Sequence, residues 1–141
     1  MAGPFHTTRI VEFSDTDMAG IVHFAAFFRF MEAAEHAFLR SLGLSVVMEW
    51  EGQKVSFPRV SAACDFLRPA RFGDELTISV EVEKVGRSSV TYAFGFTKGH
   101  EEVARGRVTA VLCGVDAENR LEAREIPSAL RAKLELTRAG R

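Results

Sequence analysis

The chain has 141 residues, of which 47% are hydrophobic and 26% are charged, and its net charge at pH 7 is −1. This length and this apolar fraction predict one domain, residues 1–141, with a substantial hydrophobic core. The nearly neutral charge excludes a general electrostatic attraction to nucleic acid or to an anionic membrane.

The first residues and the cysteines bear on the cellular compartment. The opening sequence, MAGPFHTTR, contains no apolar segment of the kind that secretory signals carry. Cys64 and Cys113 each lie in an apolar, strand-like segment, and neither belongs to a CxxC pair. Free thiols are therefore favoured over a disulfide, and no metal site is expected from these residues. Together these observations predict a cytoplasmic location.

The first third of the chain carries strand, loop and helix signals in that order. β-branched and aromatic residues predict a strand over 5–13, and carboxylates with a glycine predict a loop over 14–20. A long apolar segment then predicts a helix over 24–42, ended by Gly43. This helix has no fully polar face and must be surrounded by protein, because its charged residues are too frequent for a membrane span.

The rest of the chain is dominated by period-two alternation, which indicates strands with one buried face. Strands are expected over 55–67, 75–85, 89–97 and 103–115. A bulge or bend is expected at Gly106, a connector over 45–53, and a short helix from Pro127. Short turns cannot join parallel neighbours, so the sheet should be antiparallel. The expected fold is α+β, with the sheet curled around one long helix.

The strongest candidate for chemistry is the acidic loop before the helix. Asp15 and Asp17 precede a helix entrance, where free backbone N–H groups and the helix dipole stabilise negative charge. A carboxylate beside such donors can attack or deprotonate water while the donors hold an oxyanion. From these residues alone, a capping or turn role is favoured over catalysis. His23, at the helix entrance, is a candidate substrate contact, whereas the scattered histidines do not favour a metal site.

A second candidate is the turn VGRSSV at residues 85–90. Arg87, Ser88 and Ser89 offer a positive charge and two hydroxyls, which suit a phosphate or pyrophosphate. In isolation these residues favour an ordinary solvated hairpin turn.

Two ordered motifs resemble hotdog-fold acyl-CoA thioesterases of the 4-hydroxybenzoyl-CoA thioesterase type. They are VEFSDTDMAGIVHFAAFFRFMEAAEHAFL and FLRPARFGDELTISVEVEKVGRSSVTYAF, and the similarity spans about residues 8–115. The resemblance implies a long central helix wrapped by a five-stranded antiparallel sheet, which is the hotdog fold. It also implies hydrolysis of an acyl-CoA thioester, with CoA as part of the substrate and no separate cofactor. A homodimer or homotetramer is implied, with sheets joined edge to edge and the site at the subunit boundary.

The resemblance also implies roles for single residues. Asp17 matches the catalytic carboxylate, acting as nucleophile or as general base, whereas Asp15 shapes the loop. The implied oxyanion-hole amides are those of Phe24 and His23. The implied substrate-binding residues are Gly20, Ile21, Val22, His23 and Phe27, and the residues implied to bind CoA are Arg87, Ser88 and Ser89.

Two departures from the family pattern leave the acyl group open. His23 replaces the aromatic residue common at its position, and Glu35 and His36 stand where many relatives carry an arginine. Aryl preference is therefore unsupported by the resemblance. Two alternatives also stay open, namely a thioesterase for acyl carrier protein and a non-catalytic acyl-CoA-binding module on the same fold.

Overall fold

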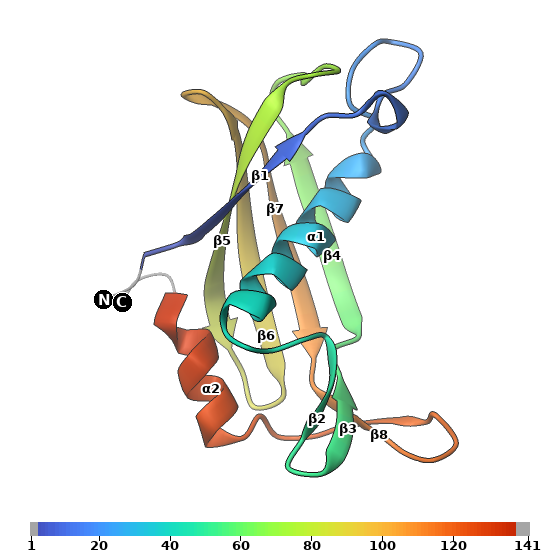
Figure 1. Cartoon of the computed structure of the whole chain (residues 1–141), viewed down its shortest axis with the longest axis vertical. Coiled ribbons are helices and arrows are strands. Elements are labelled where there is room, and N and C mark those ends of the chain that lie inside the picture. The colour runs from blue at the N-terminus through green and yellow to red at the C-terminus, as the bar shows by residue number, and fades with distance from the viewer. Residues whose placement is uncertain (1–2, 138–141) are drawn as a thin grey trace.

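The structure, a computed structural model, describes residues 3–137 and is built around a five-stranded antiparallel sheet in the order β1-β5-β6-β7-β4 (Figure 1). The strands are β1 (Phe5–Ile10), β4 (Arg59–Phe66), β5 (Glu75–Val85), β6 (Ser89–Lys98) and β7 (Glu101–Val111). In β5 and β6 every second residue is a buried apolar side chain, as the alternation predicts. The expected five-stranded antiparallel sheet is confirmed.

The buried face of this sheet packs against helix α1 (Ala26–Ser41), which crosses in front of the sheet in Figure 1. The helix buries Phe27, Phe30, Met31, Ala34, Glu35, Phe38 and Leu39. It has 16 residues and is shorter than the predicted helix over 24–42, because the chain at residues 24–25 forms a turn. The expectation of one central helix is confirmed, with these narrower limits.

Gly106 allows the helix and the sheet to approach each other closely. A side chain at this position would overlap Met31 Sδ and would lie 3.1 Å from the backbone oxygen of Ala63. The predicted bend at Gly106 is wrong, since β7 runs through it without a break and the register shift in the β6–β7 pair falls at Phe96/Thr97. The glycine therefore serves packing rather than strand bending.

A second sheet of four short strands was not predicted. Its strands are β2 (Val47–Trp50), β3 (Gln53–Ser56), β8 (Cys113–Val115) and β9 (Leu121–Ala123), in the order β2-β3-β8-β9. The connector expected over 45–53 is wrong, because β2 and β3 pair as a hairpin across Glu51 and Gly52. The single strands predicted over 55–67 and 103–115 are each divided between the two sheets, near Pro58 and at Leu112 respectively.

The carboxyl-terminal part adds a second, short helix to the same hydrophobic core. Helix α2 (Ser128–Leu134) follows Pro127, as expected, and buries Leu130 and Leu134. Among the described residues, no helix is long and apolar enough to cross a membrane. Both cysteines are free thiols, as predicted.

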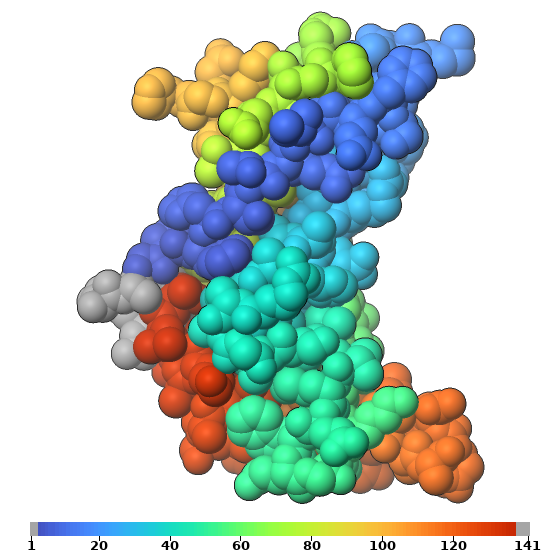
Figure 2. All heavy atoms as spheres, viewed as in Figure 1, coloured from blue at the N-terminus to red at the C-terminus, as the bar shows by residue number. Residues whose placement is uncertain are grey.

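Two turns define opposite ends of the molecule. The acidic loop and the turn at residues 67–74 lie together at the upper end of Figure 1, and Figure 2 shows them adjoining on the surface. The β5–β6 turn at residues 86–88 lies at the lower end, beside α2. The 11 residues of β5 separate the two ends by about 33 Å, at about 3.3 Å per residue.

Candidate active site

The acidic loop is a closed, hydrogen-bonded turn rather than an open coil. After a short 3-10 helix (Phe13–Asp15), the backbone forms an isolated bridge between Thr16 and Val22. Within it, the Asp17 N–H donates to the Ile21 carbonyl and the Gly20 N–H donates to the Asp17 carbonyl, each at 2.9 Å. Gly20 has φ of 80°, a left-handed backbone that glycine adopts without strain. The glycine of the motif thus permits this tight turn.

Asp15 fixes the loop through hydrogen bonds to its buried carboxylate. Its carboxylate is buried and accepts bonds from the Glu12 N–H at 2.8 Å and from Arg9 Nη2 at 3.1 Å, with Arg29 Nη2 at 3.5 Å. Its carbonyl accepts the His23 N–H at 2.8 Å. Burial alone would raise the pKa of Asp15, but the Glu12 amide and the two guanidinium groups together hold it below its ordinary value. One side chain therefore ties the loop to β1 and to the first turn of α1.

Asp17, in contrast, is exposed at the mouth of a cavity. Its Oδ1 accepts the N–H of Ala19 at 2.8 Å, which fixes the carboxylate over the loop. The Phe24 N–H has no hydrogen-bond partner within residues 3–137, whereas the His23 N–H is occupied by Asp15. Of the two amides predicted for an oxyanion hole, only that of Phe24 is free to bind a substrate oxygen.

The cavity beside Asp17 has a volume of about 510 Å³ and an apolar wall. It lies between the loop, the start of α1, the end of β4 and the turn that follows. It is lined by Asp17, Ile21, Val22, Phe24, Phe27, Phe66, Leu67, Arg68, Pro69 and Ala70. Ile21, Val22 and Phe27 lie where a substrate contact was predicted, while Gly20 and His23 do not line the cavity. The His23 ring instead stacks on Phe24, with centroids 4.8 Å apart.

Three aromatic rings form one side of this cavity. The ring centroid of Phe66 lies 5.5 Å from that of Phe27 and 6.3 Å from that of Phe24. Phe24 and Phe66 remain 62% and 49% exposed, so both rings present free apolar surface to a ligand. Such a wall suits an acyl group and offers it no hydrogen bond.

Sequence reasoning missed the part of the wall that comes from residues 66–70. The Val22 N–H donates to the Ala70 carbonyl at 2.8 Å, which joins this turn to the acidic loop. The signal available was the motif FLRPARFGD, whose proline and glycine mark a turn. The motif predicts a turn, but it does not predict that this turn contacts the acidic loop.

The turn predicted to bind CoA is not near Asp17 in the same chain. Arg87, Ser88 and Ser89 lie at the opposite end of β5, and Arg87 is exposed with its Nε 4.0 Å from a carboxylate oxygen of Glu125. The carbonyls of Arg87 and Ser88 accept the N–H groups of Ile126 and Leu112, so the backbone of this turn is fixed. Within one chain, the structure does not bring the two predicted subsites together.

A groove between α1 and β4, with a volume of about 350 Å³, holds a buried ion pair that sequence reasoning also missed. Glu35 is 1% exposed and bonds Arg59 Nη2, which also lies 3.2 Å from His36 Nε2. Burial raises the pKa of Glu35, although the charge of Arg59 opposes this. His36 is half-buried and lies within hydrogen-bond distance of Arg59, which favours a structural role for this histidine.

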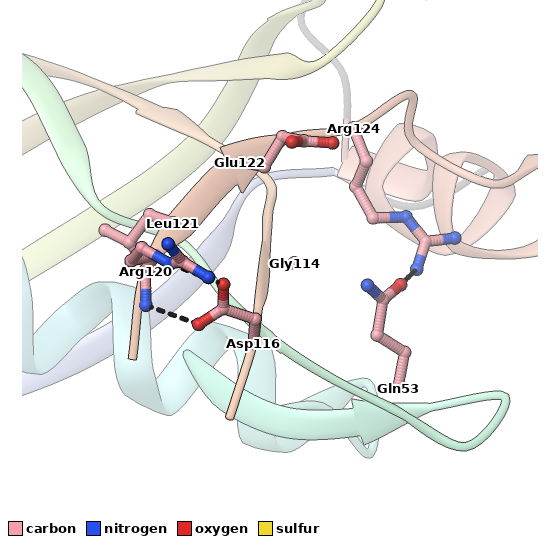
Figure 3. Close-up of a pocket in the computed structure, with 7 residues that line it drawn as sticks. All are labelled: Gln53, Gly114, Asp116, Arg120, Leu121, Glu122 and Arg124. Atoms are coloured by element: carbon pink, nitrogen blue, oxygen red, sulfur yellow. Dashed lines mark hydrogen bonds and ion pairs between the residues drawn. The ribbon is translucent and has the colours of Figure 1, made fainter. Parts of the chain in front are cut away.

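A further cavity, of about 480 Å³, lies over the small sheet and differs in character (Figure 3). Three of its charged groups have partners, as Arg120 Nε donates to Asp116 at 2.8 Å and Arg124 bonds Gln53. Within residues 3–137, no three histidine, cysteine or carboxylate side chains lie together as a metal site. Of these three cavities in residues 3–137, the Asp17 cavity combines an exposed carboxylate, a free amide and an apolar wall.

Comparison with known proteins assigns the family. The model of the thioesterase superfamily matches residues 19–105, which is more than half of the chain and includes every residue that lines the cavity described above except Asp17. A 1,4-dihydroxy-2-naphthoyl-CoA hydrolase of Nostoc punctiforme is 33% identical over 134 residues, which cover 95% of this chain and 88% of that protein.

Comparison with solved structures supports the same family assignment. A gentisyl-coenzyme A thioesterase superposes with a TM-score of 0.77 at 30% identity, covering 93% of this chain and 98% of its own. A 1,4-dihydroxy-2-naphthoyl-CoA thioesterase from Synechocystis gives a TM-score of 0.79 at 24% identity, covering 94% and 96%, and so shows the shared fold. The chain is a thioester hydrolase and belongs to the thioesterase superfamily.

Proposed function

We propose that this thioesterase hydrolyses an acyl-CoA to the free acid and CoA, with Asp17 as the catalytic carboxylate. The observation that carries the proposal is the shared cavity of Asp17 and Phe24, which puts a carboxylate and an unpaired amide N–H beside one apolar wall. The acyl group packs against the phenylalanine wall, and its thioester carbonyl accepts the Phe24 N–H.

Two routes fit this arrangement. Asp17 attacks the thioester carbonyl and expels the CoA thiolate, which gives a mixed anhydride that water then hydrolyses, or it removes a proton from a water molecule that attacks the carbonyl and expels the thiolate. In both routes negative charge develops on the carbonyl oxygen, where the Phe24 amide and the start of α1 stabilise it. Asp15 remains outside the chemistry and holds the loop.

The test is the variant Asp17→Asn, which keeps the shape of the side chain and removes its charge. We expect turnover of acyl-CoAs to fall by about a hundredfold or more, with unchanged thermal unfolding. Asp116→Asn, at another exposed aspartate whose Oδ1 accepts the N–H two residues further on, is the matched control and should retain full activity. Wild-type-like turnover by Asp17→Asn would remove Asp17 from the mechanism.

The names of the relatives suggest the first substrates to test. The related hydrolase and the superposed thioesterase are named for aromatic acyl groups, 1,4-dihydroxy-2-naphthoyl and gentisyl. An aromatic acyl-CoA is also consistent with the wall of Phe24, Phe27 and Phe66. The motifs resemble the 4-hydroxybenzoyl-CoA thioesterase type but leave the acyl group open, so 4-hydroxybenzoyl-CoA is included only as a third aromatic thioester. A panel of these thioesters, followed through release of the CoA thiol, ranks them directly.

We also propose that the enzyme is a homodimer joined along β4, the outer strand of the main sheet beside α1. This strand pairs with β7 on one side, and its Val60 and Phe66 side chains are 63% and 49% exposed. An open strand edge with apolar side chains favours pairing with another chain. Antiparallel pairing of two β4 strands would place the Phe66 end of one beside the Arg59 end of the other.

In such a dimer, the residues predicted from sequence to bind CoA would lie near the Asp17 cavity of the partner chain. Ser88 is linked to the start of β4 through two neighbouring bonds, Leu112 N–H to the Ser88 carbonyl and Val111 N–H to the Pro58 carbonyl. The turn containing Arg87, Ser88 and Ser89 therefore lies near the β4 end that would face the partner's cavity. Any role of this turn in binding CoA depends on that second copy.

The alternatives make different demands on the same cavity. Hydrolysis of a carrier-protein thioester would give higher rates on that form than on the CoA form of one acyl group. A binding-only module would bind a non-hydrolysable CoA analogue and turn over no thioester. The cytoplasmic location likewise remains a prediction, based on the free thiols and on the opening sequence.

A further inference from the structure

The end of the molecule that holds Asp17 carries several cationic side chains, and most of them are paired with carboxylates. Arg9 and Arg29 contact Asp15 at 3.1 and 3.5 Å, and Lys98 contacts Asp74 at 3.1 Å. Arg105 contacts Glu102 at 3.0 Å. Each of these four cations has a carboxylate within 4 Å, although Arg9 and Arg29 share that of Asp15.

Arg68 and Arg71 differ from these cations. In the described part of the chain neither guanidinium has a carboxylate within 4 Å, although the charge of Arg71 does act on Asp74, and each donates to a backbone carbonyl. Arg68 Nη1 bonds the Glu102 carbonyl at 2.7 Å, and Arg71 Nη1 lies 3.5 Å from the Gly20 carbonyl. A carbonyl orients a guanidinium without cancelling its full charge, and most of its five N–H donors stay available. Both side chains are exposed.

The position of these two arginines relates them to the active site. Arg68 lines the Asp17 cavity, and Arg71 touches the loop that follows Asp17. They flank Pro69 and Ala70, and the bond from Val22 to the Ala70 carbonyl fixes this turn against the loop. Figure 1 shows the turn and the loop together at the upper end of the molecule, and Figure 2 shows both at the surface.

We propose that Arg68 and Arg71 bind the phosphate groups on the thiol half of the thioester as it leaves the Asp17 cavity. This inference rests on the proposed function, which places the acyl half against the phenylalanine wall. The thiol half must then leave toward the mouth, where these two charges lie. Guanidinium groups bind phosphate oxygens through paired, charge-assisted hydrogen bonds. The phosphate contact is thus made by the chain that supplies Asp17, independently of the Arg87 turn.

The main experiment compares two thioesters of the same acyl group, one on CoA and one on N-acetylcysteamine, which has no phosphate. For Arg68→Ala/Arg71→Ala we expect KM for the CoA thioester to rise about tenfold or more, with kcat within about twofold. The N-acetylcysteamine thioester should show no change. Arg107→Ala, which removes a guanidinium paired with Glu83 at 3.0 Å, controls for net charge and should leave both substrates unaffected.

Two results would overturn the inference. An equal loss on both thioesters would show that the arginines support the structure of the loop, and an unchanged KM would show that they touch no phosphate. A third thioester, with the same acyl group on a phosphopantetheinylated carrier protein, shows whether the bound phosphate belongs to CoA or to the carrier-protein arm. A loss confined to the CoA form assigns the contact to CoA, and a loss confined to the carrier form assigns it to the protein-bound arm.

Calorimetric binding of CoA alone separates this inference from the proposed function. Weaker binding by Arg68→Ala/Arg71→Ala, in a protein that hydrolyses no thioester, would support the arginines and refute the hydrolase proposal. Hydrolysis by the wild type, with CoA binding weakened by Arg87→Ala and unchanged in the double variant, would overturn the inference in favour of the distant turn.

Discussion

Two aspartates separated by one residue have opposite surroundings. Asp15 is buried and bonded by the Glu12 amide and by Arg9 and Arg29, whereas Asp17 is exposed and keeps an oxygen free for chemistry. A buried carboxylate held by this many donors has its charged form stabilised, and its pKa is lowered accordingly. The environment thus favours a structural role for the first aspartate and is consistent with the catalytic role proposed for the second.

The pH dependence of stability should show the anchoring role of Asp15. Because its folded-state pKa lies below the ordinary 3.8, its contribution is present above that value and is lost as pH falls through the folded-state pKa. We expect Asp15→Asn to lower the free energy of unfolding at pH 7 by about 1–3 kcal/mol. Below pH 4, the difference in the free energy of unfolding between Asp15→Asn and the wild type should become smaller, as measured by urea unfolding. A constant difference at all pH values would contradict the charged role.

At the scale of elements, the contact between α1 and the sheet depends on one missing side chain. Residue 106 faces Met31, and a Cβ there would collide with its sulfur and press on the Ala63 carbonyl. The Met31 side chain can shift, but the backbone oxygen cannot easily do so, and overpacked cores are destabilised.

We expect Gly106→Ala to lower the free energy of unfolding by about 1–3 kcal/mol, measured by chemical denaturation. Gly3→Ala is the control, because no atom lies within 4 Å of a side chain at that position, and its stability should be unchanged. If the sulfur is the main obstacle, Gly106→Ala should cost less stability in a Met31→Ala background than in the wild type, as a double-mutant cycle would measure. An equal cost in both backgrounds would assign the strain to the β4 backbone.

A different element, β4, contributes both to the cavity wall and to the proposed dimer contact. Its Phe66 forms part of the cavity wall, and its outer edge is the proposed dimer contact. Cys64, between them, is half-buried, and burial with the neighbouring Asp65 raises the pKa of its thiol to about 11. We expect native Cys64 to react slowly with iodoacetamide at pH 8, and rapid labelling would contradict this protected position.

At the scale of the whole molecule, the dimer proposal can be tested with matched valines. Val60 on β4 and Val47 on β2 are 63% and 55% exposed. Val60→Lys should reduce the mass in solution from twice 15.6 kDa to a single chain, because a charge on the edge opposes strand pairing. Val47→Lys should leave the mass unchanged, as read by light scattering, and a dimeric Val60→Lys would move the interface elsewhere.

The sequence predicted those features that follow from local periodicity or from an ordered motif. Strand β5 was predicted with its observed limits, and the central helix, the free thiols and α2 after Pro127 were also expected. The second sheet was not, because its strands have three or four residues each and pair over long distances, too short for a periodic signal. The cavity wall at residues 66–70 and the Glu35–Arg59 pair were missed for a related reason. Each depends on contacts between segments far apart in the chain.

The position of Phe66 on an edge strand has a kinetic consequence. If the second copy completes the cavity, the fraction of competent sites follows mass action between chains, and it must fall on dilution. Turnover per chain would then rise with enzyme concentration until the population is fully assembled, with a half-point at the dissociation constant of the dimer. The activity of such an enzyme would depend on its own concentration in the cell.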